Sequence, residues 1–229
     1  GVLSAGLLFS ASMSMGPIYG RILYWSVQKI SIFMAVMVLG SLIFQYPFGK
    51  ASDAWDRRKM LAVVQLSGIA IVLLMWIYSV KDPVNFSIWG TALILGGVVG
   101  SIYPLSSAVL YDWLNPAQMV AASGKIIITF ALGAMGGPFL AAVAMDKWGA
   151  QGFLIYLGLV MSVLMIYVFY RVQVRESIPV DDQEEFVLVP RMPPVNPVLD
   201  SRTEPDYETR DPENLQFNLD ASILIAEDH

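Results

Sequence analysis

The chain has 229 residues, of which 56% are hydrophobic and 14% charged, and its mean hydropathy is +0.59; soluble domains carry about 25% charged residues. This balance excludes an ordinary soluble domain, and the absence of cysteine excludes disulfides, thiolate nucleophiles and cysteine metal sites. The net charge of -5 combines two opposite parts, because residues 1–175 hold 11 basic and 5 acidic residues whereas residues 176–229 hold 3 basic and 14 acidic residues.

Six apolar stretches are predicted to form membrane-spanning helices. Each is bounded by charged or turn residues, and about 20 apolar residues let a helix cross roughly 30 Å of hydrocarbon. We therefore expect an all-α polytopic membrane protein with a six-helix part over residues 1–175. Because the sequence opens inside an apolar run without an initiator Met, we interpret its start as a truncation and not as a signal peptide. The expected spans are residues 1–20, 29–48, 59–80, 85–111, 118–145 and 151–171.

The basic residues predict the orientation, since six spans leave both ends of this part on one side of the membrane. The loops at 49–59 and 112–117, with the exit at 171–175, hold 6 Lys and Arg, whereas the opposite loops hold 4. The positive-inside rule places the richer side in the cytoplasm. We expect a multi-pass protein of the cell (inner) membrane with both ends of the fragment cytoplasmic.

The segment between the second and third spans combines a glycine, acids and a basic cluster. Gly49 can end the second helix tightly, Asp53 can lie at the positive end of a helix dipole, and the arginines can pair with carboxylates or with carbonyl groups at a helix C-terminus. Such a segment can hold two helices together in one conformation. An ordinary basic loop would explain the basic run but not the Gly and Asp before it. The candidate residues are Gly49, Asp53, Asp56, Arg57 and Arg58.

This segment resembles the loop signature of the major facilitator superfamily, in which a Gly, three residues, an Asp and a basic cluster join the second and third helices of each six-helix half. The resemblance implies helices seven to twelve of a twelve-helix carrier, with the N-terminal six-helix half as partner. Over about residues 1–170 the chain also resembles the YcaD-like bacterial group, which implies no particular substrate. That likeness lies in Tyr46-Pro47-Phe48-Gly49, Ser52-Asp53, Asp56-Arg57-Arg58, Tyr103-Pro104-Leu105, Asp112 and Met119-Val120-Ala121-Ala122-Ser123.

The fifth span carries small residues at helical spacing beside a proline. Gly133 and Gly137 are four residues apart, on one helix face, and Pro138 follows; such residues allow close approach to another helix. The stretch resembles the Gly-Pro antiporter-type motif of the superfamily's fifth helix, here in the eleventh. Helix packing and a gating hinge are both open interpretations.

Few polar residues remain to line a solute path, for which we consider Lys125, Gln45 and Tyr103. Lys125 is the one charge well inside the expected spans, and an intramembrane charge is costly. It can bind an anionic solute or pair with an acid of the missing half; alternatively the helix starts late and the side chain reaches the headgroups. The acids of the membrane part lie at span ends, so any proton-coupling acid is expected in the absent half.

Residues 176–229 are predicted to form an acidic, Pro-rich cytoplasmic tail. The 7 prolines and 14 acidic residues of this segment leave too little apolar surface for a packed core. We therefore expect a largely disordered tail. The stretch from Leu215 to Ala226 can fold on a partner or stay solvated.

The sequence does not support an enzyme. Its single histidine, His229, is the last residue, so that Ser123 has no histidine to activate it. No cofactor or metal is predicted, and the scattered basic residues do not form a nucleic-acid patch.

The resemblance implies a secondary active transporter that moves a small solute by alternating access in the lipid bilayer. A proton-coupled exporter is one form of this prediction. The alternative is a non-transporting membrane receptor, sensor or scaffold of the same fold, acting through the acidic tail.

Overall fold

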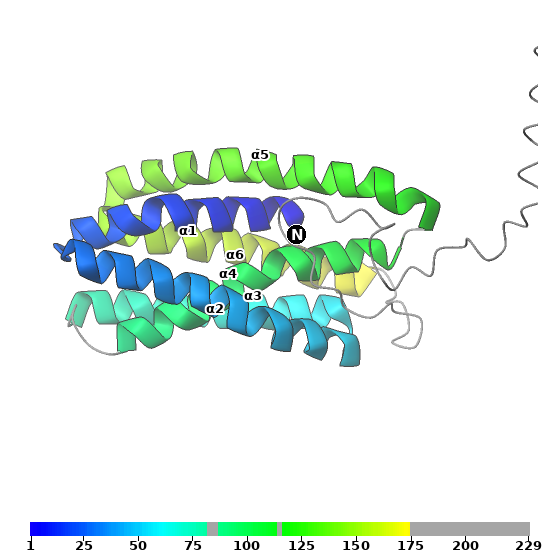
Figure 1. The fold of residues 1–229 in the computed structure, drawn as a ribbon, viewed down its shortest axis with the longest axis horizontal. Helices are drawn as coiled ribbons and strands as arrows, with labels where there is room; N and C mark the ends of the chain where they lie inside the picture. Colours follow the sequence, from blue (N-terminus) through cyan, green and yellow to red (C-terminus); the bar gives the residue numbers. More distant parts are fainter. Residues whose placement is uncertain (82–86, 114–115, 175–229) are drawn as a thin grey trace, which may run out of the picture. The chain divides into compact units, whose positions relative to one another are not determined.

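A computed structural model describes residues 1–81, 87–113 and 116–174, and within them it has six helices and no strand (Figure 1). All six are long and apolar enough to cross a membrane, which confirms the predicted all-α fold. The expected tail at 176–229 lies outside the described residues. The helices are α1 (Val2–Ile22), α2 (Val27–Ala54), α3 (Arg57–Lys81), α4 (Ser87–Tyr111), α5 (Pro116–Trp148) and α6 (Ala150–Val174).

Several helices are longer than the apolar stretches that predicted them, and α2 and α5 exceed them the most. α2 continues to Ala54, six residues past the expected end at 48, and α5 begins at Pro116 and ends at Trp148, outside the expected 118–145. Apolarity marks only the part of a helix that suits hydrocarbon, whereas the backbone hydrogen bonds can continue beyond it. Pro116 suits the first helical position because its missing N–H would have no partner there.

Successive helices run in opposite directions, so α1, α3 and α5 are parallel to one another and antiparallel to α2, α4 and α6 (Figure 1). The most extensive packing joins parallel pairs: α2 lies against α4, and α1 lies against α5. α3 packs on α4 and α6. The turns from α2 to α3 and from α4 to α5 therefore lie at the same end of the bundle.

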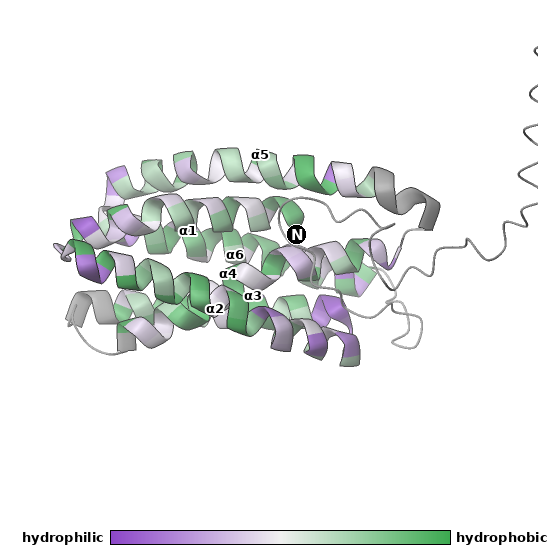
Figure 2. Cartoon of the chain, viewed as in Figure 1, coloured by the Kyte–Doolittle hydropathy of each residue, from purple (hydrophilic) through white to green (hydrophobic). Residues whose placement is uncertain are grey.

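The core is formed where these helices meet. Its largest fully buried side chains include Phe33 of α2, Leu95 and Ile102 of α4, and Phe153 of α6. Figure 2 shows hydrophobic residues along the middle of the helices and hydrophilic residues gathered near several helix ends. Large apolar side chains also stay exposed, above all on α2, α5 and α6, as expected for surfaces that face lipid or another apolar partner.

Glycines bring the backbones of the two parallel pairs together. A Cβ added to Gly40 of α2 would collide with the Leu93 carbonyl of α4, and one added to Gly96 would collide with the Met37 carbonyl. Gly133 of α5 lies in the same way against the Leu3 carbonyl of α1. Without these glycines the helices could not pack so closely.

Candidate functional site

The break between α2 and α3 is short and is capped by a carboxylate. Only Trp55 and Asp56 separate the two helices. The Asp56 Oδ1 atom accepts a hydrogen bond of 2.9 Å from the Arg58 backbone N–H, and the Asp56 carbonyl accepts one of 3.0 Å from the Met60 N–H. These are the bonds of a helix N-cap. Asp56, which caps the start of α3, therefore takes the position at the positive helix end that we had expected for Asp53.

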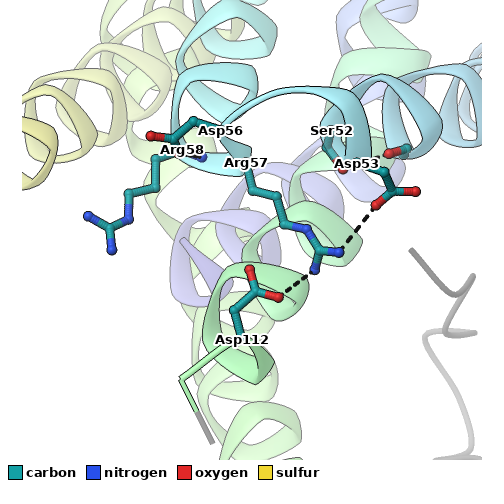
Figure 3. A network of polar contacts seen from close by, with 7 residues as sticks. Ser52, Asp53, Asp56, Arg57, Arg58 and Asp112 are labelled. Carbon is teal, nitrogen blue, oxygen red and sulfur yellow. Dashed lines mark hydrogen bonds and ion pairs between the residues drawn. The ribbon is translucent and has the colours of Figure 1, made fainter. Parts of the chain in front are cut away.

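Arg57, in the first turn of α3, joins three helices (Figure 3). Its Nη1 atom donates to Asp112 Oδ1 at 2.9 Å, and its Nη2 atom donates to Asp53 Oδ1 at 3.2 Å. Asp53 belongs to the last turn of α2, and Asp112 directly follows α4. The planar guanidinium offers several donors at fixed angles, so one side chain can bind two carboxylates at once.

Burial makes this arrangement more consequential than a surface ion pair. The Arg57 side chain is 3% exposed and that of Asp112 is 6% exposed, whereas Asp53 is 32% exposed. Exposed pairs contribute about 0–1 kcal/mol, but removal of one partner from a buried pair costs about 3–5 kcal/mol because the other charge stays buried. The contact between Arg57 and Asp112 thus links the start of α3 to the end of α4 through buried charges.

Arg58 takes a different direction from Arg57 (Figure 3). Its side chain is buried, and its Cζ atom lies 5.2 Å from the ring centroid of Trp113. A guanidinium over an indole face is held by a cation–π interaction. Both arginines of the predicted segment therefore contact residues that immediately follow α4.

We call Asp53, Asp56, Arg57, Arg58 and Asp112 the charged cluster. The structure brings together four of the five residues predicted for this segment and adds Asp112. The fifth, Gly49, does not end α2 as expected: it is buried inside the helix, where its carbonyl accepts a 2.6 Å hydrogen bond from the buried Ser52 hydroxyl. The helix can pass through Gly49 because glycine lowers helix stability by only about 1 kcal/mol.

The small residues of α5 face α1. Gly133 and Gly137 contact the carbonyls of Leu3 and Leu7, respectively. Pro138 lies inside the helix. One turn before it, the Ala134 carbonyl accepts a 2.7 Å hydrogen bond from the Ser10 hydroxyl of α1.

The three residues considered for a solute path lie on three different helices. Lys125 of α5 is exposed, Gln45 of α2 is partly buried, and Tyr103 of α4 is buried with its ring edge-on to Phe130 of α5, 5.1 Å between centroids. No hydrogen bond among the residues described here joins Lys125 to Gln45. α5 begins at Pro116, and its membrane-spanning stretch covers Ala122–Trp148, so Lys125 lies near the start of that stretch and both interpretations of this residue stay predictions.

Sequence reasoning missed the roles of Asp112, Trp113 and Ser10. Asp112 was noted in the family resemblance and as one of the acids at span ends, but it was not paired with Arg57, although both lie on the same expected side of the membrane. Trp113 was not among the candidate residues. For Ser10 the sequence holds no signal, because its partner Ala134 is 124 residues away.

The family model of the Major Facilitator Superfamily matches residues 1–210. The chain belongs to this superfamily. The charged residues from Asp53 to Arg58 span the break between α2 and α3, where the sequence resemblance placed the family's loop signature.

Curated relatives within the superfamily agree. YfkF of Bacillus subtilis (strain 168), an uncharacterized MFS-type transporter, is 30% identical over 157 residues, which are 69% of this chain and 39% of YfkF. YcaD of Salmonella paratyphi B, also an uncharacterized MFS-type transporter, is 24% identical over 148 residues, which are 65% of this chain and 37% of YcaD. The chain therefore spans about two-fifths of these superfamily members.

A solved structure has the same fold. The crystal structure of an auto inhibited POT family peptide transporter matches with a TM-score of 0.63 and 11% sequence identity, over 78% of this chain and 37% of that one. At this identity the likeness concerns the fold alone. The six helices of this chain are thus arranged as in part of that transporter.

Proposed function

We propose that the complete protein is a secondary active transporter that moves a small solute across the cell membrane by alternating access, and that this chain supplies one six-helix half. The observation that carries the proposal is the buried contact of Arg57 with Asp53 and Asp112, which joins α2, α3 and α4 at one end of the bundle. The superfamily and its MFS-type transporter relatives support the same function.

The charged cluster is suited to hold part of a transporter rigid within one conformation. Taking charges out of water is costly, and the cost is offset only when the ions keep good hydrogen-bond geometry. A small displacement of α4 against α3 would lengthen the 2.9 Å bond between Arg57 and Asp112 and leave both charges buried without each other. The cluster would therefore hold the ends of α2, α3 and α4 together as one body that moves as a unit.

The partner of this body is proposed to be the N-terminal six-helix half of the same protein. α2 and α5 leave large apolar side chains exposed, among them Leu42, Ile43, Met135 and Phe139. Part of this surface would face lipid, and part would face the other half across the solute path.

Tyr103, Gln45 and Lys125 are proposed for that path, and Lys125 would favour an anionic solute. A single half has one wall of the path only, so residues 1–174 alone should not carry flux.

The test is flux through the complete protein in proteoliposomes under a proton gradient, screened against drugs, sugars and organic acids. With a transported solute in hand, Asp112→Asn should lower the flux at least tenfold, because Arg57 would lose a buried anionic partner. Asp146→Asn is the matched control, since Asp146 is an exposed acid near the opposite end of α5.

Two outcomes would count against the proposal. A correctly folded protein that moves no solute of the panel would favour the receptor or scaffold interpretation. Undiminished flux in Asp112→Asn would show that transport does not depend on the charged cluster.

A further inference from the structure

Pro138 creates an unusual requirement in the middle of α5. In a regular helix the N–H of residue 138 would donate to the Ala134 carbonyl, but proline has no N–H. In hydrocarbon an unsatisfied backbone carbonyl costs several kcal/mol, and neighbouring helices or hydroxyl side chains usually satisfy it. The Ala134 carbonyl therefore needs a partner from outside the ladder of its own helix.

Ser10 of α1 provides that partner. Its hydroxyl donates to the Ala134 oxygen at 2.7 Å. A serine is short, so the two helices must lie very close for this bond to form. The glycines on either side allow this approach, because Gly133 and Gly137 contact the α1 backbone at Leu3 and Leu7.

Contacts of α5 with α1 and with α6 flank Pro138. Before Pro138, the helix lies against α1 through Gly133 and the Ser10 bond. After Pro138, Ala141 and Met145 are buried, and the backbone at Ala144 lies against Gly152 of α6. A bend at Pro138 would thus move the first segment of α5 while the second stays on α6.

α1 itself is tied to α6 close to this point. The Tyr156 hydroxyl of α6 donates to the Leu7 carbonyl at 3.2 Å, one helical turn before Ser10. α1 and α6 are therefore tied to each other, and separation of the first segment of α5 from α1 would break the Ser10 bond.

We propose that Ser10 is a positioning residue that controls bending of α5 at Pro138: its hydroxyl satisfies the proline-freed Ala134 carbonyl while α5 lies against α1, and the bond breaks when the segment before Pro138 moves away. This inference rests on the proposed alternating access, because it assigns to α5 one of the movements that such a cycle requires. The bond would thereby influence the equilibrium between two conformations, one in which the segment before Pro138 lies against α1 and one in which it has moved away.

The experiment is a double-mutant cycle in the complete protein with Ser10→Ala, Pro138→Ala and both together. Pro138→Ala restores an N–H that can bond to the Ala134 carbonyl within α5, which makes the Ser10 hydroxyl redundant. The readout is the distance between spin labels at Lys50→Cys and Lys125→Cys, two exposed positions on α2 and on α5 before Pro138. The control pair, Gln28→Cys and Asp146→Cys, lies on exposed positions of α2 and of α5 after Pro138.

Ser10→Ala should change the ratio between the two conformations, measured as two populations in the distance distribution of the labels at positions 50 and 125, by about three- to tenfold. This is the range expected for one interhelical hydrogen bond in a bilayer. The distances of the control pair should stay unchanged. In the Pro138→Ala background the same substitution should have no further effect. Ser14→Ala is the matched control variant, because the Ser14 hydroxyl bonds within its own helix to the Ser10 carbonyl; it should leave both distances unchanged.

An equal effect of Ser10→Ala in both backgrounds, or no effect in either, would overturn the inference. The distances are measured without any solute. A protein that fails to transport therefore contradicts the proposed function, whereas the distance cycle alone decides the role of Ser10.

Discussion

At the residue scale, the membrane part contains polar groups with very different surroundings. Arg57 is buried yet bound by two carboxylates. Gln65, on α3, is fully buried, and neither its amide nitrogen nor its amide oxygen has a hydrogen-bond partner among the described residues. The first residue binds oppositely charged partners, whereas the second carries a desolvation cost.

Gln65 gives a prediction about stability. Its replacement by Leu removes two buried polar atoms at a similar volume, so Gln65→Leu should stabilise the folded protein by about 1 kcal/mol. Thermal unfolding of the detergent-solubilised complete protein would show this as a higher Tm. A lower Tm would mean that the amide makes a favourable interaction with another part of the complete protein.

At the scale of the elements, the bundle is organised by two parallel helix pairs, α1 with α5 and α2 with α4. Lipid tails are as apolar as leucine side chains, so helices in a bilayer are held by close contact and by hydrogen bonds more than by the hydrophobic effect. Gly133 and Gly137 allow this contact in the first pair, and Gly40 and Gly96 allow it in the second. The glycines of α5 thus have a structural role whether or not α5 bends.

Two adjacent glycines of α5 test this role. A Cβ on Gly137 would collide with the Leu7 carbonyl, whereas a Cβ on Gly136 would lie 3.7 Å from the Leu7 Cδ2 atom, an ordinary contact. Gly137→Ala should therefore destabilise the protein by about 1–3 kcal/mol through overpacking, and Gly136→Ala should be neutral or slightly stabilising. Equal thermal unfolding of the two variants would contradict the close packing of α1 and α5.

At the scale of the whole molecule, the charged cluster and the basic residues near it distinguish one end of the bundle from the other. We expect this end to face the cytoplasm because Lys and Arg are retained on that side. The buried arginines of the cluster contact protein groups, whereas the exposed Lys50 and Lys59 would face the cytoplasmic headgroups and water.

Orientation can be measured with single cysteines, because this chain has none of its own. In cells expressing the complete protein with its other cysteines replaced, a membrane-impermeant maleimide added outside should label Gln28→Cys and spare Lys50→Cys. These exposed positions lie at opposite ends of α2. Labelling of Lys50→Cys alone would reverse the assigned orientation.

The sequence by itself determined the six helices and the family, because apolar length and a short charged signature are local properties that need no contact to be recognised. It did not determine the end of α2, since apolarity marks the hydrocarbon layer and not the helix. Nor could it show which faces are buried, because in lipid both the core face and the outer face of a helix are apolar.

Only the tertiary structure decided which residues that are distant in the sequence contact each other. Arg57 is 55 residues from Asp112, and Ser10 is 124 residues from Ala134, and such pairs become neighbours only when the helices pack. The sequence could show that Pro138 frees a carbonyl. Which hydroxyl would satisfy it depended on how closely the glycines let α1 approach α5.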